Sequence, residues 1–313
     1  MKHLKSMYLG TSIAISWAWG TSLILGMQIA QQKGLETFLI WATANCLTLA
    51  IFGILYKKEI IIPKVLDLKV VKIFTNLIQI FCFIIQMKIL YETLNGYLGN
   101  SDQAYWISVG VSVFLVLWMY RKGLDASIFT DLFQGIGTIL CLGTMAVYAA
   151  YYYHPESTHS SGFSDIQWGI WSACILLSGI MTDLQHWQRA KKNSDGYAFE
   201  YASLFFAFYL TLVFILSKYQ FDQTLNLLLC FSVLGVTTST IDSIAVALHR
   251  DFGKKVGTLI GLGICVLFTL LIELQVLSLW SYFGVIRVGL AIYILYWCYR
   301  YRVSHKRTTL STL

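Results

Sequence analysis

The chain has 313 residues, of which 57% are hydrophobic, 12% are charged and two are prolines. A soluble domain is typically about 25% charged, so this composition excludes an ordinary soluble protein and indicates an integral membrane protein. The net charge of +7 does not indicate nucleic-acid binding, because the basic residues occupy short gaps between apolar runs. The sequence contains no zinc-binding His-Glu spacing, nucleophile elbow or phosphate-binding loop, so we do not expect an enzyme.

Ten apolar runs are long enough to cross a bilayer as helices, since a span needs roughly 20 residues. They lie at 7–31, 35–56, 68–91, 104–121, 126–152, 164–186, 198–217, 224–248, 255–276 and 279–301. The gaps between them alternate between basic and mostly acidic, which places both termini in the cytoplasm by the positive-inside tendency. We therefore expect an all-α integral membrane protein with ten transmembrane helices, forming a single domain (1–313) in a bacterial inner membrane.

The first and sixth spans both carry residues that weaken a helix. Gly20 interrupts the first, and Ser178-Gly179 interrupts the sixth. Matched interruptions in the two halves of a transporter commonly mark a binding site at the middle of the membrane, although glycine is also frequent in ordinary transmembrane helices. Two repeats would occupy 1–153 and 163–302, followed by a basic tail at 303–313.

The cytoplasmic ends of the fifth and sixth spans also carry polar residues. Asp131 and Gln134 lie three residues apart in the fifth span and share a helix face. A carboxylate at this depth could form an ion pair with a nearby basic residue at the membrane interface. It could also bind a cation that is leaving a deeper site. The spacing favours the ion pair. At the end of the sixth span, Trp187 and Arg189 are typical of an interfacial anchor.

The eighth span contains the most polar segment at membrane depth, Thr237 to Ser243. Lipid offers no water, so each of these side chains needs a protein partner or a bound ion. In a helix the carbonyl of Val236 points toward Ser239 and Thr240, so three oxygen atoms converge on one side. Such oxygens suit an alkali cation, and hydroxyls also bond their own helix or a neighbouring one. The residues alone leave both interpretations open.

Taken in order, these segments resemble the solute:sodium symporter family, as a trimmed ten-helix member. The resemblance lies in four motifs: Ser16 to Gly26, Gly123 to Gln134, Gln188-Arg189-Ala190 and Ser239-Thr240-Ile241-Asp242-Ser243. It implies a LeuT-type fold of five-plus-five inverted repeats. It also implies a sodium site between the first and eighth spans, made by the carbonyls of Ser16, Trp19 and Val236 and the hydroxyls of Ser239 and Thr240. By the same resemblance Asp131 lies on the inner sodium exit route. Asp242 lies two residues beyond Thr240 in the helix, so it turns to a different face from the ligands.

A solute site is expected beside the sodium site. The polar or aromatic candidates to line it are Gln28, Asn76, Gln79, Gln86 and Trp171. Each of them also suits packing or hydrogen bonding between helices, which is the more common role of such residues.

We expect a secondary active transporter that moves a small polar organic solute inward by alternating access, with the sodium ion as its coupling ion. We expect the protein to contact the lipid bilayer and to have no nucleic-acid partner. The sequence sets no oligomeric state, and a monomer is compatible with it. The alternatives are a ten-helix drug/metabolite-type exporter and a membrane sensor that keeps a transporter fold without transport. The exporter would move its substrate outward with proton or exchange coupling, and it gives Ser239 and Thr240 no role.

Overall fold

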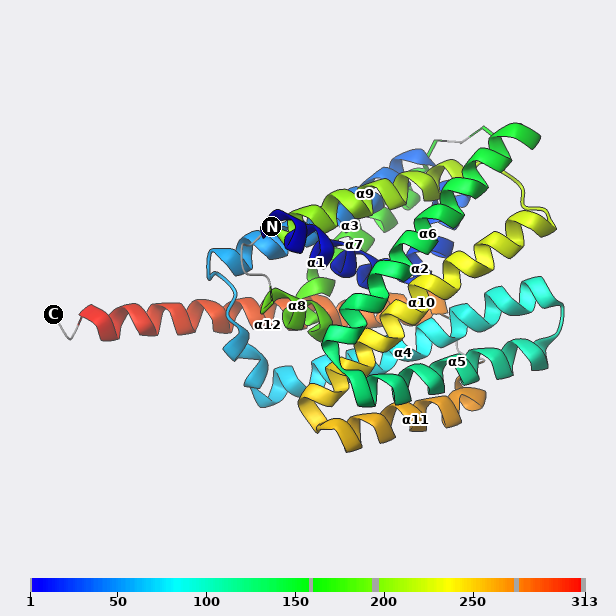
Figure 1. The fold of residues 1–313 in the computed structure, drawn as a ribbon. Coiled ribbons are helices and arrows are strands. Elements are labelled where there is room, and N and C mark those ends of the chain that lie inside the picture. The colour runs from blue at the N-terminus through cyan, green and yellow to red at the C-terminus, as the bar shows by residue number, and fades with distance from the viewer. Residues whose placement is uncertain (1, 158–159, 193–196, 273–275, 311–313) are drawn as a thin grey trace.

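The computed structural model describes residues 2–157, 160–192, 197–272 and 276–310, and this part of the chain is all-α, with no β-strand. The helices lie side by side in one bundle (Figure 1). In chain order they are α1 (Lys2–Trp17), α2 (Gly20–Gln32), α3 (Leu35–Lys57), the 3₁₀ helix η1 (Pro63–Asp67), α4 (Lys69–Leu98), α5 (Ser101–Lys122), α6 (Leu124–Tyr152), α7 (Phe163–Thr182), α8 (Leu184–Ala190), α9 (Ala198–Leu216), α10 (Gln223–Phe252), α11 (Lys254–Leu271) and α12 (Val276–Leu310).

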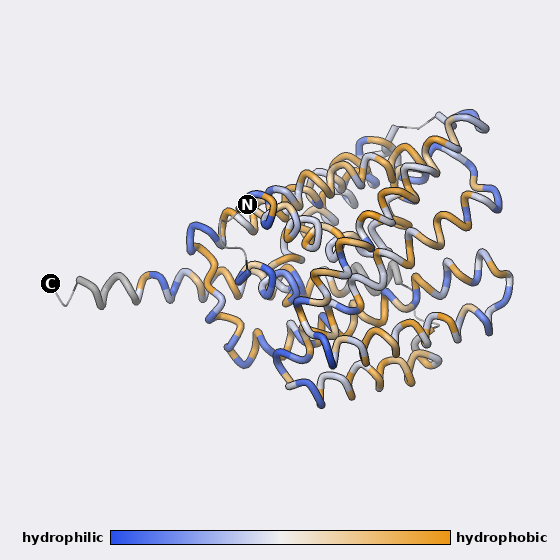
Figure 2. The backbone as a smooth tube through the Cα atoms, viewed as in Figure 1, coloured by the Kyte–Doolittle hydropathy of each residue, from blue (hydrophilic) through white to orange (hydrophobic). Residues whose placement is uncertain are grey.

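Hydrophobic residues run along most of the length of the bundle, and hydrophilic residues gather toward its ends (Figure 2). Large apolar side chains such as Trp106, Phe114 and Leu140 are more than half exposed. In the described part of the chain, seven helices are long and apolar enough to cross a membrane, or eight if α1 and α2 together form one span. The protein is therefore a multi-pass helical membrane protein. The helices α7 and α11 are not among the seven, so ten spans remain a prediction.

The two ends of the chain lie toward the same end of the bundle (Figure 1). The turns after α5 and after α10 are formed by Gly123 and Gly253, with φ of 70° and 77°. Glycine adopts this conformation without the strain that a side chain brings, so each helix passes directly into the next. The helix α12 continues through Leu310, so the segment predicted as a tail from residue 303 is an extension of this helix as far as it is described.

The first span is broken, as its sequence predicts. The helix α1 ends at Trp17, α2 begins at Gly20, and their axes differ by 65°. The break is packed tightly between α4 and α10: a Cβ on Gly20 would lie 2.8 Å from a methyl of Ile89 and 2.7 Å from a methyl of Thr237. Glycine is therefore required here, because the neighbouring side chains leave no room for a Cβ atom.

A second break follows α7, four residues beyond the Ser178-Gly179 position that the sequence suggests. Asp183 has an extended backbone and caps the N-terminus of α8, its side chain accepting from the N–H of Gln185, as aspartate commonly does at this position. The chain then turns back into the protein, and every residue of α8 is buried. The prediction that Trp187 and Arg189 form an interfacial anchor is therefore wrong.

Replacing Gly20 by alanine is expected to lower the melting temperature of the purified protein, because forcing extra atoms into a filled core costs about 1–3 kcal/mol. The matched control is Gly137→Ala in α6, where an added Cβ has nothing within 4 Å. Melting temperatures are compared in the same detergent. Equal values for the two variants would contradict tight packing at the first break.

Candidate functional site

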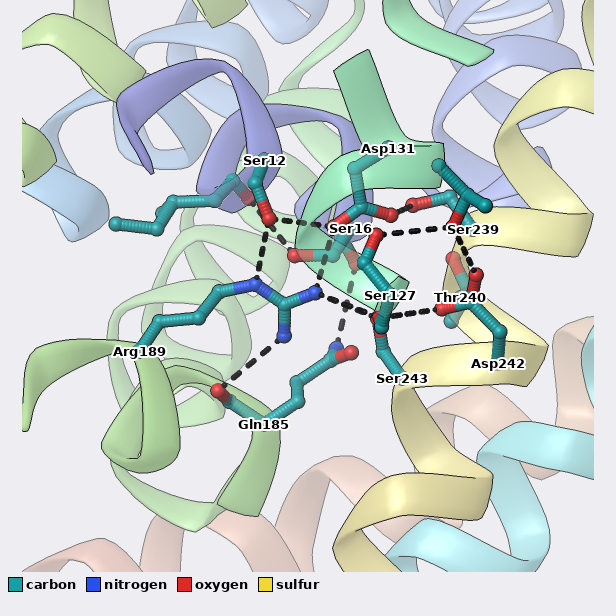
Figure 3. Close-up of polar contacts among 12 residues, drawn as sticks. Ser12, Ser16, Ser127, Asp131, Gln185, Arg189, Ser239, Thr240, Asp242 and Ser243 are labelled. Carbon is teal, nitrogen blue, oxygen red and sulfur yellow. Dashed lines mark hydrogen bonds and ion pairs between the residues drawn. The ribbon is translucent and has the colours of Figure 1, made fainter. Parts of the chain in front are cut away.

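A buried ion pair joins α6 to α8. Nη2 of Arg189 lies 2.7 Å from Oδ2 of Asp131, and both side chains are fully buried. Ser12 of α1 bridges the two charges: its hydroxyl donates to Oδ2 of Asp131 at 2.5 Å and accepts from Nε of Arg189 at 2.9 Å. Figure 3 shows Arg189 reaching from its short helix toward Ser12 and Asp131. The pair thus connects three helices that are distant in sequence.

The same pair is bound to α10. The Ser239 hydroxyl donates to Oδ1 of Asp131 at 2.5 Å, and Nη2 of Arg189 donates to the Ser243 hydroxyl at 2.8 Å. The resemblance places Asp131 on the route by which sodium leaves. The structure places it in direct contact with one of the residues that the resemblance assigns to the sodium site itself.

Asp242 belongs to this network through Ser127. The Ser127 hydroxyl donates to Oδ1 of Asp242 at 2.7 Å and lies 3.4 Å from Nη2 of Arg189. The hydroxyls of Thr130 and Ser243 also donate to the Asp242 carboxylate, at 3.0 and 3.1 Å. Asp242 lies on a different helix face from Thr240, as their spacing implies, but that face is part of the site too. We call Ser12, Ser127, Asp131, Arg189, Ser239, Asp242 and Ser243 the Arg189 cluster.

The charges of the Arg189 cluster do not balance. When all three groups are ionised, two carboxylates face one guanidinium, which leaves one negative charge. An uncompensated charge is costly inside a protein and more so at membrane depth. A monovalent cation or a proton would restore neutrality. The cluster therefore has the charge of a cation-binding site.

On the α1 side, the oxygens expected to bind sodium are engaged by protein donors. The Ser16 carbonyl accepts from Nε1 of Trp19 at 3.1 Å and from Nε2 of Gln185 at 3.3 Å. The Trp19 carbonyl accepts from the backbone N–H of Ser22 at 2.7 Å. Both carbonyls lie at the break between α1 and α2, the kind of interruption at which transporters coordinate cations, and a cation would have to share or displace these donors.

On the α10 side, the Val236 carbonyl accepts from the Thr240 hydroxyl at 3.0 Å, which is the local helix bond that the sequence left as an alternative. Ser239 instead bonds across to Asp131. All five predicted ligands are hard oxygens, so their chemistry suits an alkali cation. The Ser239 hydroxyl gives its proton to Asp131, and its oxygen lone pairs stay available to a cation.

Two of the residues predicted to line the solute site form hydrogen bonds at the two helix breaks. Nε2 of Gln79 donates to Oδ1 of Asp183 at 3.1 Å, and Oε1 of Gln86 accepts from the N–H of Gly20 at 3.0 Å. The two glutamines lie two turns apart on α4, so one helix contacts both breaks. Their interhelical hydrogen bonding is confirmed, and contact with a solute remains a prediction.

The other three candidates lie elsewhere. Nδ2 of Asn76 donates to Oδ2 of Asp251 at 2.8 Å, which joins α4 to the end of α10. Trp171 is 38% exposed on the outer face of α7, where it faces away from the protein interior. Gln28 is half-buried on α2. None of the three lines the cavity beside the first break.

That cavity is small, with room for about one water molecule. Six residues line it, one from each of five helices and Trp19 from the first break: Trp17, Trp19, Ser22, Asn45, Leu176 and Arg287. None of them except Trp19 is among the residues predicted for either site. Sequence reasoning also missed Ser12 and Ser127. The sequence signals in this region were Arg287, inside the last apolar run, and Asp183, a preferred helix N-cap residue inside the sixth run.

Comparison of the sequence with protein-family models gives no match, and comparison with curated proteins gives none. The resemblance to solute:sodium symporters therefore stays a prediction from the motifs.

Removing Arg189 is expected to be more harmful than removing Asp131. Arg189→Gln leaves two carboxylates without their cation and should cost about 3–5 kcal/mol, the usual range for breaking a buried pair. Asp131→Asn leaves Arg189 balanced by Asp242 and should cost less. Thermal unfolding of both variants measures the difference.

The control is Lys192→Gln, which removes an exposed ion pair with Asp125 and should cost less than about 1 kcal/mol. If Asp131→Asn proves as destabilising as Arg189→Gln, Asp242 does not share the charge of the cluster.

Proposed function

We propose that the protein is a secondary active transporter that couples the inward movement of a small polar organic solute to sodium by alternating access. The observation that carries the proposal is the Arg189 cluster, a buried set of two carboxylates and one guanidinium between helices of a membrane protein. Ionisable groups at membrane depth are expensive and typically mark ion and substrate pathways. A cluster with one surplus negative charge suits a coupling cation.

The order of the helices supports a LeuT-type arrangement of five plus five spans. The broken pair α1 and α2 opens the first half of the chain, and four helices, α3 to α6, follow it. The broken pair α7 and α8 opens the second half, and α9 to α12 follow it. In transporters with inverted repeats, discontinuous helices from the two halves form the binding site near the bilayer midplane. The contacts of α4 with both breaks agree with this arrangement.

In the proposed cycle, sodium binds beside the Arg189 cluster. Sodium arriving among the α1 carbonyls and the α10 hydroxyls is bound by the lone pairs of the Ser239 oxygen, whose proton stays hydrogen-bonded to Asp131. The charge of the ion then compensates the surplus negative charge of the cluster. A ligand shifts a conformational equilibrium only through its different affinities for the two states. Because its ligands come from α1 and α10, sodium favours the state in which these two helices are together, and it leaves past Asp131.

Proton coupling is the second candidate, and Asp242 favours it. Its described contacts are with three hydroxyls. A proton on Asp242 would remove the surplus negative charge and leave the bond between Ser239 and Asp131 intact. This candidate gives Ser239 no role in ion binding, so the two can be separated at that residue. The exporter alternative shares this coupling and differs in the direction of transport.

Sodium chloride is expected to raise the melting temperature of the purified protein above its value in choline chloride at equal ionic strength. Binding to the folded state alone adds about 2.7 kcal/mol at a ligand concentration one hundred times Kd. Ser239→Ala should lose most of this shift.

The matched control is Ser232→Ala, on the same helix, where the hydroxyl donates to the carbonyl of Leu228 one turn back. It should keep the full sodium shift. An unchanged shift in Ser239→Ala, or no shift in the wild type, would contradict sodium binding at this site. Proteoliposomes carrying an inward sodium gradient then test uptake over a solute panel.

A further inference from the structure

A wide groove runs along the outside of the bundle between α5, α6 and α10. Its volume is about 650 Å³, within the range of about 300 to 1,000 Å³ that is usual for small-molecule sites. Phe114, Phe133 and Phe231 line it and are more than half exposed, so it opens toward the surrounding lipid. We propose that this groove binds a hydrophobic amine from the membrane, with the ammonium group at Asp242. The inference goes beyond the proposed function and does not require transport.

The buried side of the groove is polar, unlike its aromatic walls. On α6, Thr130, Gln134 and Thr138 follow one another at intervals of four residues, so they share one helix face. On α10, Thr238 and Asp242 have the same spacing, and all five residues line the groove. Apolar walls with a few placed polar groups are typical of small-molecule sites.

Two oxygen atoms on this side lack a hydrogen-bond partner among the described residues, Oε1 of Gln134 and Oγ1 of Thr138. Nε2 of Gln134 donates to the Thr238 hydroxyl at 3.0 Å, and that hydroxyl donates to the carbonyl of Leu234 at 2.6 Å. The Thr238 oxygen is therefore the acceptor, which fixes the orientation of the Gln134 amide and leaves Oε1 unpaired. A buried acceptor without a donor is costly, so a ligand that carries a donor is favoured here.

The charge of the groove is negative. Among the side chains described as lining it, Asp242 is the charged one. Asp242 belongs to the Arg189 cluster, which has one surplus negative charge when its groups are ionised. This charge attracts a monovalent organic cation and repels an anionic amphiphile. The charge and the unpaired oxygen of Gln134 thus favour the same kind of ligand, a cation with N–H donors.

Thr130 controls access from the groove to Asp242. Its hydroxyl donates to Oδ2 of Asp242 at 3.0 Å, and it lies 3.0 Å from the carbonyls of Ala126 and Ser127 as well. The hydroxyl can therefore donate to its own helix, which frees Oδ2 for an ammonium and leaves no group unpaired. An ammonium has three donors, so it can also serve Oε1 of Gln134, one turn along α6.

The rest of the groove suits the apolar body of the ligand. From Thr130 to Cys141 it follows α6 for roughly 16 Å, at 1.5 Å per residue. Thr130 lies near the start of α6 and Cys141 near its middle. The ammonium is therefore closer to the end of the bundle and the hydrocarbon chain deeper in the membrane, as in a lipid leaflet. The Thr138 hydroxyl between them offers a partner to a second polar group of the ligand.

An ammonium at Asp242 compensates the same surplus charge as the sodium ion of the proposed function. Each cation should therefore weaken the binding of the other, and by the same factor, because coupling between two sites is reciprocal. A hydrophobic amine would then act on the transporter from the membrane.

The test compares three amphiphiles that share one hydrocarbon chain, on the full-length protein in phosphatidylcholine nanodiscs and potassium chloride. Dodecylamine is cationic, dodecan-1-ol is neutral and dodecanoate is anionic. Each is added at the same mole fractions of the lipid, and the melting temperature is measured. Dodecylamine should raise it in a saturable way, and the other two should not.

Gly137→Leu is the variant that fills the groove. Gly137 lines the groove, and an added Cβ has nothing within 4 Å, so the variant should fold and should weaken dodecylamine binding at least tenfold. The matched control is Gly143→Leu on the same helix, where an added Cβ also meets nothing within 4 Å. It should bind dodecylamine as the wild type does, since Gly143 does not line the groove.

Asp242→Asn removes the charge and should abolish the dodecylamine shift. If this variant does not fold, the comparison of Gly137→Leu with Gly143→Leu decides the question, because neither glycine belongs to the Arg189 cluster. Both variants experience the same membrane, so any general effect of the amine on the lipid is equal in the two.

Equal stabilisation by dodecan-1-ol would indicate a lipid chain in the groove, and stronger stabilisation by dodecanoate would indicate an anionic lipid. Either result, the absence of a dodecylamine shift, or a shift that survives Gly137→Leu would overturn the inference. Sodium binding without any amine effect would overturn it and leave the symporter proposal standing. Amine binding that depends on the groove and is indifferent to sodium would uphold it and count against sodium at the Arg189 cluster.

Discussion

The ion pair between Arg189 and Asp131 is the contact on which the interior of this protein depends. Its charged atoms are fully buried, so each needs compensation from within the protein. Ser12 from α1 and Ser239 from α10 complete the hydrogen bonding of the Asp131 carboxylate. One carboxylate therefore fixes the relative positions of helices that come from both halves of the chain. Anything that changes the charge of the cluster changes how those helices meet.

The two helix breaks impose a second constraint on the structure, because they lie in a protein that spans a membrane. A broken helix exposes backbone groups that lipid does not satisfy, so the protein has to supply partners. At the first break, Gln86 of α4 accepts from the N–H of Gly20. At the second, the Asp183 side chain accepts from the N–H of Gln185, and Gln79 of α4 donates to that side chain. Because these partners are side chains, they can exchange when a ligand enters. The breaks are thus stabilised and remain capable of rearrangement, which alternating access requires.

Hydropathy predicted the helices well and the site only in part. The expected runs at 35–56 and 198–217 agree with α3 and α9 to within a residue, because long apolar runs in lipid have few alternatives to helix. The sixth run, 164–186, was taken as one helix, so Arg189 was placed at the membrane surface. Asp183 ends that helix early and turns Arg189 inward. The only local sign of this helix end in the sequence is Asp183, and its side chain is held by Gln79 from another helix.

The central claim is that the Arg189 cluster holds a place for one monovalent cation. Equilibrium binding of radioactive sodium to the purified protein tests it most directly. The account predicts saturable binding of one sodium ion per protein, lost in Ser239→Ala and retained in Ser232→Ala. Absence of saturable sodium binding to the wild type, or equal binding in both variants, would contradict it.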